Sequence, residues 1–403
     1  MLGFVGLILS GNTKVLPTKS LIFESIAVSG FERLKSIFLF LQKSLILVTQ
    51  ENKFKYLNKL DYFDLFLNTI FKNLLKTCII ISFTFMTLKA HIATVNYEDF
   101  VSDDPNRKLN FIAHLGNSLS EIGFILLRNH GITEALGNEL FSASKKFFDL
   151  PDEIKSKYEF PALAGQRGYI GKFKETAKGF KTPDMKEFYH IGQTIQNAIG
   201  PDYPPNIWPE EVHELKEISL RIYQIFEEIG RKLLQAIALY LDLSENFFDE
   251  KIHAGNSILR LLHYFPVKDI SKLPAGSVRA AAHEDINLIT LLMGGSAEGL
   301  QAKIKAGKWI DVNPLSDQII VNIGDMLQRL TNGQLVSTSH RVINKNPLLM
   351  KKSRYSTPFF LHPIPSMDLS ALPSTVNQQQ PKKFQDMTAG KYLNERLKQL
   401  GLK

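Results

Sequence analysis

Three residues in the C-terminal third of the chain have the types and order of a metal-ligand set: His283, Asp285 and His340. Two imidazoles and one carboxylate form the facial triad that holds non-haem Fe(II) and leaves one face of the metal open for oxygen and a second reactant. A single carboxylate leaves the iron site with net positive charge, so an anionic chelate such as a 2-oxo acid would be attracted to it. The sequence therefore predicts an iron site that binds oxygen and an acidic co-substrate.

An Arg-x-Ser pair follows the second histidine. Arg354 offers a planar guanidinium that can bind a carboxylate through two parallel hydrogen bonds, and Ser356 offers a hydroxyl. Taken singly, each of these five residues is more often a surface polar group, a salt-bridge partner or part of a turn. Their shared order, their spacing and their strand-rich surroundings favour one site in which a carboxylate is anchored beside a metal.

The elements that must position these residues are predicted to be strands. Residues at i and i+2 of a strand point to the same face, so we expect His283 and Asp285 to share a strand and to face one metal. His340 must then come from another strand. Three stretches between the ligands carry strand or turn signals: 307–312, 317–325, and 330–334, whose Asn-Gly pair predicts a β-hairpin. A chain that doubles back several times between its ligands indicates a β-barrel or jelly roll.

Several motifs of the chain resemble the isopenicillin N synthase-like branch of the Fe(II)/2-oxoglutarate dioxygenases. In the C-terminal half these motifs are residues 257–266 (SILRLLHYFP), 282–285 (AHED), 324–327 (GDML), 339–342 (SHRV) and 354–360 (RYSTPFF). The earlier part of the chain adds residues 123–125 (GFI), 129–132 (NHGI) and 147–151 (FFDLP). The similarity runs from roughly residue 92 to the C-terminus. It is specific to the superfamily and not to one substrate.

The resemblance implies a mainly β fold with flanking helices, built as a double-stranded β-helix (jelly-roll) barrel with a long supporting helix and a helical N-terminal part. It implies that His283, Asp285 and His340 bind Fe(II) and are catalytic. It further implies that Arg354 and Ser356 hold the distal carboxylate of 2-oxoglutarate. The implied reaction uses O2 to oxidise a small molecule, by default through hydroxylation, and releases succinate and carbon dioxide.

One departure from the family pattern concerns a tyrosine that in many relatives directly precedes the proline of a Tyr-Pro motif and helps to hold the co-substrate. Here Phe265 occupies that position and Tyr264 lies one residue earlier. Tyr264 is therefore the candidate for this cofactor-binding role. A shift of one residue along a strand, however, reverses the face to which a side chain points.

Two alternatives to a 2-oxoglutarate dioxygenase stay open. In isopenicillin N synthase-like oxidases proper, the equivalent Arg-x-Ser pair grips the carboxylate of the substrate, and no 2-oxoglutarate is used. A barrel that has lost catalysis could also serve as a binding or sensor module. The intact ligand set argues against this second class, because a missing ligand usually marks such a loss.

The first 85 residues differ in composition from the rest of the chain. They carry ten Lys/Arg and five Asp/Glu, and thus +5 of the net charge of +8, together with eleven of the twenty-eight Phe and the single Cys. The apolar runs in this leader (1–85) are shorter than the ~20 residues that span a bilayer. We expect an over-extended start, with translation beginning at Met86. A membrane-surface segment or a genuine helical extension are the alternatives.

The rest of the chain is expected to be one compact unit, with an N-terminal dioxygenase region over 86–209 and a catalytic region over 210–403. Its charges nearly balance and it carries no module of interleaved aromatic and basic residues, so we expect no nucleic-acid partner. The lack of cysteine excludes disulfides and thiol catalysis and is compatible with a reducing cytoplasm. We expect a small-molecule substrate, no membrane contact unless the leader is real, and a monomer or weak dimer.

Apolar periodicity predicts the helices around the barrel: 106–122, 133–148 and 210–241, with a terminal helix over 388–402. The apolar stripe of 210–241 is most simply a core face, and a coiled-coil dimer is the alternative. The Gly-rich stretch 162–180 is predicted to be a loop, and such loops often carry substrate contacts.

Several single residues are weaker candidates. Substrate contact or a structural role is equally expected for Arg167, Tyr169, Lys186 and Phe188. His263 and His362 do not fit the order of the ligand set and are expected to be ordinary barrel residues. Neighbours on a strand alternate between faces, so one of Phe359 and Phe360 should face the cavity and the other the core.

Overall fold

The structure, a computed structural model, describes residues 92–399 except for 177–181, 195–202, 268, 270–272, 274–276, 295–298 and 344–346. The predictions for the leader and for a start at Met86 lie outside the described residues, as do the last residues of the predicted terminal helix. Among the described residues, no helix is both long enough and apolar enough to cross a membrane.

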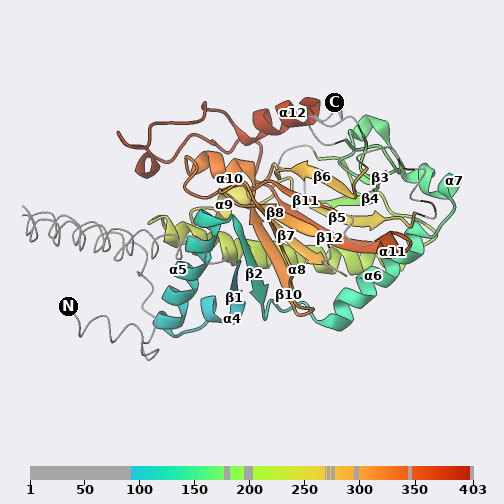
Figure 1. The fold of residues 1–403 in the computed structure, drawn as a ribbon, viewed down its shortest axis with the longest axis horizontal. Coiled ribbons are helices and arrows are strands. Elements are labelled where there is room, and N and C mark those ends of the chain that lie inside the picture. The colour runs from blue at the N-terminus through green and yellow to red at the C-terminus, as the bar shows by residue number, and fades with distance from the viewer. Residues whose placement is uncertain are drawn as a thin grey trace, which may run out of the picture. The chain divides into compact units, whose positions relative to one another are not determined.

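Two β-sheets form the centre of the structure (Figure 1). The larger sheet has eight strands in the order β1-β2-β10-β7-β12-β5-β4-β3, and the smaller has four in the order β6-β11-β8-β9. The strands are β1 (Ala93–Asn96), β2 (Phe124–Arg128), β3 (Gly168–Ile170), β4 (Glu187–Gly192), β5 (Ile258–Tyr264), β6 (Ala280–His283), β7 (Ile289–Gly294), β8 (Leu300–Lys303), β9 (Trp309–Asp311), β10 (Gln318–Ile323), β11 (His340–Val342) and β12 (Arg354–Leu361).

The strands from β5 onward pair in a nested order. The first pairs with the last (β5 with β12), the next inward pair is β6 with β11, then β7 with β10, and finally β8 with β9, all antiparallel. The chain therefore runs out and returns alongside itself, and successive pairs alternate between the two sheets. This arrangement is the double-stranded β-helix, and the predicted jelly roll is confirmed. The ladders of the described residues form two open sheets and not one closed barrel.

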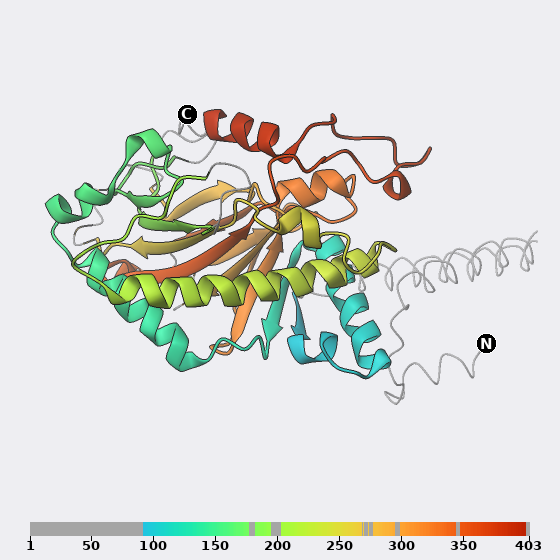
Figure 2. The same cartoon turned by 180° about the vertical axis from the view of Figure 1, so that it is seen from behind.

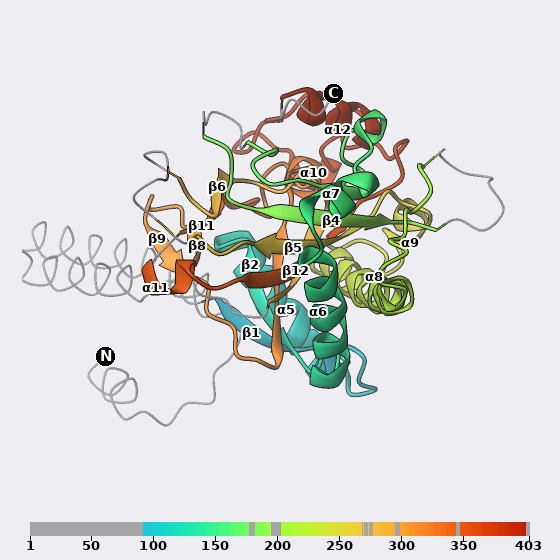
Figure 3. The same cartoon turned by 90° about the vertical axis from the view of Figure 1, so that its right-hand side faces the viewer.

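The described residues form the helices α4 (Tyr97–Phe100), α5 (Pro105–Glu121), α6 (Glu134–Phe148), α7 (Asp152–Lys155), α8 (Glu214–Tyr240), α9 (Asp249–Ile252), α10 (Asp325–Leu330), α11 (Pro347–Met350) and α12 (Ala389–Gln399). Of these, α8 covers the outer face of the larger sheet, where it packs on β7 and β12, and α5 and α6 pack against α8. Figure 2 shows α8 running along this face, and Figure 3 shows α6 beside it. The ring of Phe226 on α8 stacks on that of Phe359 on β12, with centroids 5.6 Å apart. The apolar stripe of α8 is thus a core face, as predicted.

The helix starts follow local sequence signals. Asp104 caps α5 by accepting a hydrogen bond from the backbone N–H of Asn106, and Pro105 occupies the first helical position, where no N–H is needed. Thr133 caps α6 through the N–H of Leu136 in the same way. Both helices lie within one or two residues of their predicted bounds, because capping and apolar spacing are local properties.

The β-hairpin predicted at Asn332 and Gly333 is wrong. These residues follow the end of α10 and have positive φ values of 50° and 80°. The N–H of Gly333 donates to the carbonyl of Gln328 at 2.8 Å, which closes the helix end with left-handed residues. The preference of Asn-Gly for positive φ serves a helix terminus as well as a hairpin, and only the tertiary structure decides between them. The predicted loop at 162–180 also contains a short strand, β3.

Where α5 crosses α8, a glycine is required. A Cβ atom on Gly116 would lie 2.0–2.3 Å from ring carbons of Tyr240. We expect Gly116→Ala to lower the free energy of unfolding by about 1–3 kcal/mol because overpacking outweighs the gain in helix propensity. Denaturant unfolding followed by circular dichroism measures this change.

The matched control for this prediction is Gly137→Ala in α6, where the new Cβ would meet only Met293 Sδ at 3.5 Å. This helical position should gain roughly 0.5–1 kcal/mol from the better helix former. Equal effects of the two substitutions would contradict the close approach of α5 and α8.

Candidate active site

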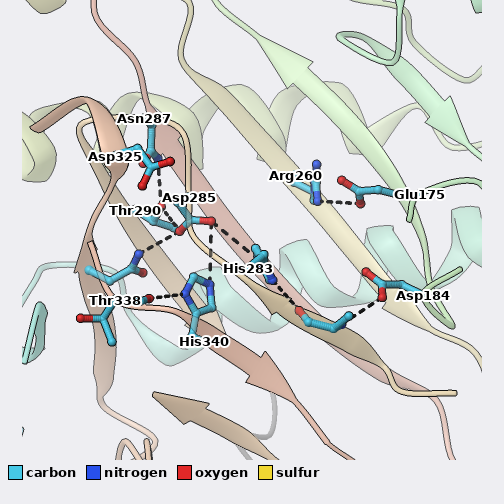
Figure 4. Close-up of polar contacts among 12 residues, drawn as sticks. Glu175, Asp184, Arg260, His283, Asp285, Asn287, Thr290, Asp325, Thr338 and His340 are labelled. Carbon is cyan, nitrogen blue, oxygen red and sulfur yellow. Dashed lines mark hydrogen bonds and ion pairs between the residues drawn. The ribbon is translucent and has the colours of Figure 1, made fainter. Parts of the chain in front are cut away.

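The three predicted metal ligands converge at one end of the smaller sheet (Figure 4). His283 ends β6, His340 begins β11, and the two residues are directly paired across the ladder. Asp285 Oδ1 lies 3.9 Å from His283 Nε2 and 3.8 Å from His340 Nε2. The expectation that Asp285 shares a strand with His283 is wrong, because β6 ends at His283 and Asp285 lies in the loop that follows.

A hydrogen bond at Nδ1 fixes the tautomer of each imidazole. His283 Nδ1 lies 2.7 Å from the carbonyl oxygen of Ala281, and His340 Nδ1 lies 3.1 Å from that of Thr338. A carbonyl oxygen only accepts, so each Nδ1 carries the proton and donates it. Each Nε2 then presents its lone pair toward Asp285, which is the arrangement typical of metal-binding histidines.

The carboxylate of Asp285 is fixed from the larger sheet. Its Oδ2 atom accepts hydrogen bonds from Thr290 Oγ1 at 2.6 Å and from Asn322 Nδ2 at 2.8 Å. Asn287 Nδ2 donates to Thr290 Oγ1 at 2.9 Å, so the hydroxyl of Thr290 is directed toward Asp285. Oδ1 therefore remains as the oxygen that faces the two histidines.

The pKa shifts of Asp285 and His283 also fit a divalent cation. Burial raises the pKa of Asp285, but the two histidines and the hydrogen bonds from Asn322 and Thr290 outweigh this effect and leave the pKa lowered. Burial, assisted by the neighbouring His340, lowers the pKa of His283. A carboxylate and neutral imidazoles are the forms that coordinate a metal ion. The one oxygen and two nitrogens lie within 4.8 Å of one another, so the residues fit an iron ion.

The residues predicted to bind the co-substrate lie together on the inner face of the larger sheet. Arg354 on β12 is paired with Tyr264 on β5, and its guanidinium carbon lies 4.9 Å from the centre of the tyrosine ring. Ser356 lies two residues along β12 and therefore on the same face. All three side chains are buried. Tyr264 is directly paired with Arg354 across the ladder, so the two side chains point to the same face of the sheet, and the co-substrate role of Tyr264 stays a prediction.

A cavity of about 230 Å³ adjoins the metal-ligand set. His283 and Asp285 line it on one side, and Ile258 and Phe360 of the larger sheet line it on another. The terminal helix α12 contributes Leu397. Sites for drug-sized ligands are usually about 300–1,000 Å³, so this volume suits a small molecule.

Comparison with known proteins decides the family. Residues 92–211 match the family model for the N-terminal region of the non-haem dioxygenase in morphine synthesis, and residues 255–363 match that of the 2OG-Fe(II) oxygenase superfamily. The 2-oxoglutarate-Fe(II) type oxidoreductase hxnY of Emericella nidulans is 31% identical over 319 residues, which cover 74% of this chain and 88% of hxnY. The chain belongs to the 2OG-Fe(II) oxygenase superfamily.

Other relatives of this oxygenase agree. Proline hydroxylase buaE of Petromyces alliaceus is 33% identical over 76% of this chain and 99% of its own length. A 2OG-Fe(II) oxygenase family protein of Caulobacter crescentus has a crystal structure with a TM-score of 0.68 and 38% identity, covering 76% of this chain and 98% of that one. A full-length Neurospora crassa protein, solved in complex with alpha-KG, gives a TM-score of 0.67 and 31% identity, with coverage of 76% and 95%. The protein is an Fe(II)/2-oxoglutarate-dependent dioxygenase.

The remaining candidate residues lie on the two faces of the larger sheet. Phe360 lines the cavity and Phe359 packs on α8, as strand alternation predicts. Tyr169 lies away from the cavity and donates to Glu187, while Lys186 lines the cavity. His362, expected to be an ordinary barrel residue, also lines the cavity, with its pKa lowered to about 4 by burial.

His263 and Glu187 belong to a buried polar cluster on the outer face. His263 Nδ1 lies 2.8 Å from Glu187 Oε1, and Lys155 Nζ donates to Glu187 Oε2 at 2.8 Å. The ring of His263 stacks on that of Tyr355. His263 is therefore structural, as predicted. Arg167 is also buried, and its Nη1 donates to the carbonyl oxygen of Gln166.

Sequence reasoning missed several charged residues that line the cavity, among them Arg260 and Glu175. Arg260 had a usable signal, because it precedes Tyr264 by four residues on one strand and period two places both on the same face. Glu175 lies in the Gly-rich stretch and carried no such signal, since nothing local indicates which element it contacts.

The support of Asp285 by Thr290 can be tested separately from the ligands. We expect Thr290→Val, which removes the donor but keeps the shape, to weaken Fe(II) binding by roughly 10–100-fold, as is typical for partners of metal ligands. Anaerobic titration with Fe(II) measures this change. The exposed Thr94 of β1 provides a matched control, Thr94→Val, which should leave the affinity unchanged. Equal affinities in the two variants would show that the hydrogen bond to Asp285 is dispensable.

Proposed function

We propose that this oxygenase holds Fe(II) with His283, Asp285 and His340 and hydroxylates a small molecule bound in the adjoining cavity. One observation carries the proposal: two Nε2 atoms and one Oδ1 atom converge, while the other polar atoms of the three side chains are engaged in hydrogen bonds. When bound, Fe(II) supplies the site at which O2 is reduced with electrons from 2-oxoglutarate and substrate. The residues of the chain orient the reactants and exclude water.

We assign the distal carboxylate of 2-oxoglutarate to Arg354 and Ser356. A buried guanidinium matches a carboxylate in charge and in planar shape, and the serine hydroxyl can donate to one oxygen. Tyr264 lies against the guanidinium, which supports a role in orienting it. The similar Neurospora crassa protein, which shares the fold, binds alpha-KG, and this favours the co-substrate over the substrate as the partner of Arg354.

The substrate type, the oligomeric state and the cellular compartment are inferred from the relatives, from helix α8 and from the position of the cysteine. Thymine is bound by the Neurospora crassa protein, and buaE is a proline hydroxylase, so we infer a small polar substrate and no nucleic acid. The apolar stripe of α8 is buried in the core of its own chain, which favours a monomer or weak dimer. We place the enzyme in a reducing cytoplasm, because its one cysteine lies in the leader. We retain the division into regions 86–209 and 210–403.

The iron ligands are tested by Asp285→Ala. We expect this variant of the full chain to keep its fold and to lose both Fe(II) binding and turnover, because two histidines remain without the charged ligand. Anaerobic Fe(II) titration and succinate formation measure the two losses. His114→Ala, at an exposed position of α5, is the matched control. Full iron binding by Asp285→Ala would refute the assignment.

The co-substrate site is tested by Arg354→Lys, which keeps the charge and removes the planar fork. One hydrogen bond to a charged group contributes about 1.5–3 kcal/mol, so the dissociation constant of 2-oxoglutarate should rise by roughly 10–100-fold. The readout is the metal-to-ligand charge-transfer band that needs both Fe(II) and 2-oxoglutarate under anaerobic conditions.

Arg341→Lys is the matched control for Arg354→Lys. Arg341 lies over the ring of Trp309, with its guanidinium carbon 4.0 Å from the ring centroid. Iron binding without the band in the unmodified chain would favour an oxidase in which Arg354 and Ser356 bind the substrate instead.

A further inference from the structure

The cavity has a charged wall beside the iron ligands. Arg260 on β5 and Glu175 both line it, and their side chains are 16% and 14% exposed. Figure 4 shows the pair on the His283 side of the site. Neither residue takes part in the metal-ligand set or in the proposed co-substrate site, so their presence in the cavity needs a separate explanation.

The guanidinium of Arg260 is held rigidly. Its Nε donates to His190 Nε2 at 2.7 Å, and His190 Nδ1 lies 2.6 Å from the carbonyl oxygen of Gly165. Burial and the neighbouring Arg260 lower the pKa of His190, which keeps the ring neutral and able to accept from Arg260. The aromatic rings of Phe188 and Phe360 lie 4.0 and 5.1 Å from the guanidinium carbon. Only the outer edge of the guanidinium therefore remains for a ligand.

Glu175 is held by two cations. Its Oε2 atom accepts from Lys186 Nζ at 2.8 Å and lies 3.4 Å from Arg260 Nη1. Lys186 Nζ also lies 2.7 Å from Asp184 Oδ2, so the wall contains two carboxylates and two cations. Asp184 Oδ1 accepts from the backbone N–H of Ala281, two residues before His283. The balanced charge cluster is thereby fastened to the strand that carries an iron ligand.

Two polar atoms of this wall have no hydrogen-bond partner within the part of the chain that the structure describes: Arg260 Nη2 and Glu175 Oε1. One is a donor and the other an acceptor, and they belong to side chains in contact with each other. We propose that this pair recognises the substrate, with Arg260 Nη2 donating to a carbonyl oxygen and Glu175 Oε1 accepting from the adjacent N–H of an amide or lactam. The inference rests on the proposed function and names the substrate class of its cavity.

The charge balance of the wall favours an amide over a charged ligand. A carboxylate bound to Arg260 would add a negative charge to a cluster that is already neutral, and burying an uncompensated charge is costly. An amino acid would have to lose the hydration of two full charges. An amide places a donor beside an acceptor in one plane and carries no net charge. The apolar side chains of Ile258, Phe360, Leu393 and Leu397 suit the rest of such a molecule.

Three probes with six-membered rings separate these possibilities: the lactam 2-piperidone, the ketone cyclohexanone, which lacks the N–H, and the amino acid L-pipecolate. Their dissociation constants are measured by calorimetry on the full chain loaded anaerobically with Fe(II) and 2-oxoglutarate. We expect the lactam to bind at least about tenfold more tightly than the ketone, because a buried carboxylate gains an N–H partner. Tighter binding of L-pipecolate, equal binding of lactam and ketone, or no lactam binding would each overturn the proposal.

Two variants test whether Arg260 and Glu175 cause the preference for the lactam. Arg260→Lys removes the planar fork, and Glu175→Gln keeps the size of the side chain but loses its charge. Each should reduce the lactam preference by about tenfold or more, with thermal unfolding confirming that the variants are folded. Arg231→Lys, at the exposed ion pair with Glu228 on α8, is the control. If a folded Glu175→Gln variant kept the lactam preference, the proposed role of the Arg260–Glu175 pair would be wrong.

The same samples keep this inference separate from the proposed function. The charge-transfer band should survive in Arg260→Lys and Glu175→Gln, because neither residue contacts the triad or Arg354. Loss of the band from the unmodified chain would contradict the iron and co-substrate roles, while the lactam preference is read independently from the calorimetry.

Discussion

The antiparallel pairing of His283 with His340 is the contact on which the rest of the site depends. Both imidazoles reach one point only because their strands are aligned in this register, and a slip of one residue would turn one ring to the opposite face. The strands β7 to β10 lie between the two histidines in sequence and must return the chain to β6. The nested strand pairing of the jelly roll therefore brings the two histidines together as well as forming the sheets.

The two sheets meet at Asp285. Its backbone follows the smaller sheet, while Thr290 and Asn322, which donate to its carboxylate, come from neighbouring strands of the larger one. A buried carboxylate needs such donors, because burial alone would favour its neutral form. The same hydrogen bonds that keep Asp285 ionised also leave one oxygen directed at the histidines. The packing of the two sheets therefore also orients the carboxylate of Asp285 toward the histidines.

Because neighbouring residues on a strand point to opposite faces, one face of the larger sheet lines the site and the other packs on the helices. On β12, Arg354, Ser356 and Phe360 face inward, while Tyr355 and Phe359 face the helices. On β5, Arg260 and Tyr264 face inward, and His263 joins the buried cluster with Glu187 on the outer face. Each strand therefore carries a core contact and a site contact at adjacent positions. The long helix α8 stabilises the inner face indirectly, by packing on the outer one.

The sequence by itself predicted the metal-ligand residues and their order, the jelly roll and the main helices. The helices follow from capping and periodicity, which are local properties, while the ligand set and the jelly roll were implied by motifs that resemble the family. The tertiary structure alone placed Asp285 in a loop, ended a helix at Asn332 and Gly333, and set Tyr264 against Arg354. It alone also brought Glu175 from a Gly-rich loop to Arg260 on a strand. Contacts of this kind depend on strand register and loop path, which are fixed by long-range packing and not by neighbouring residues.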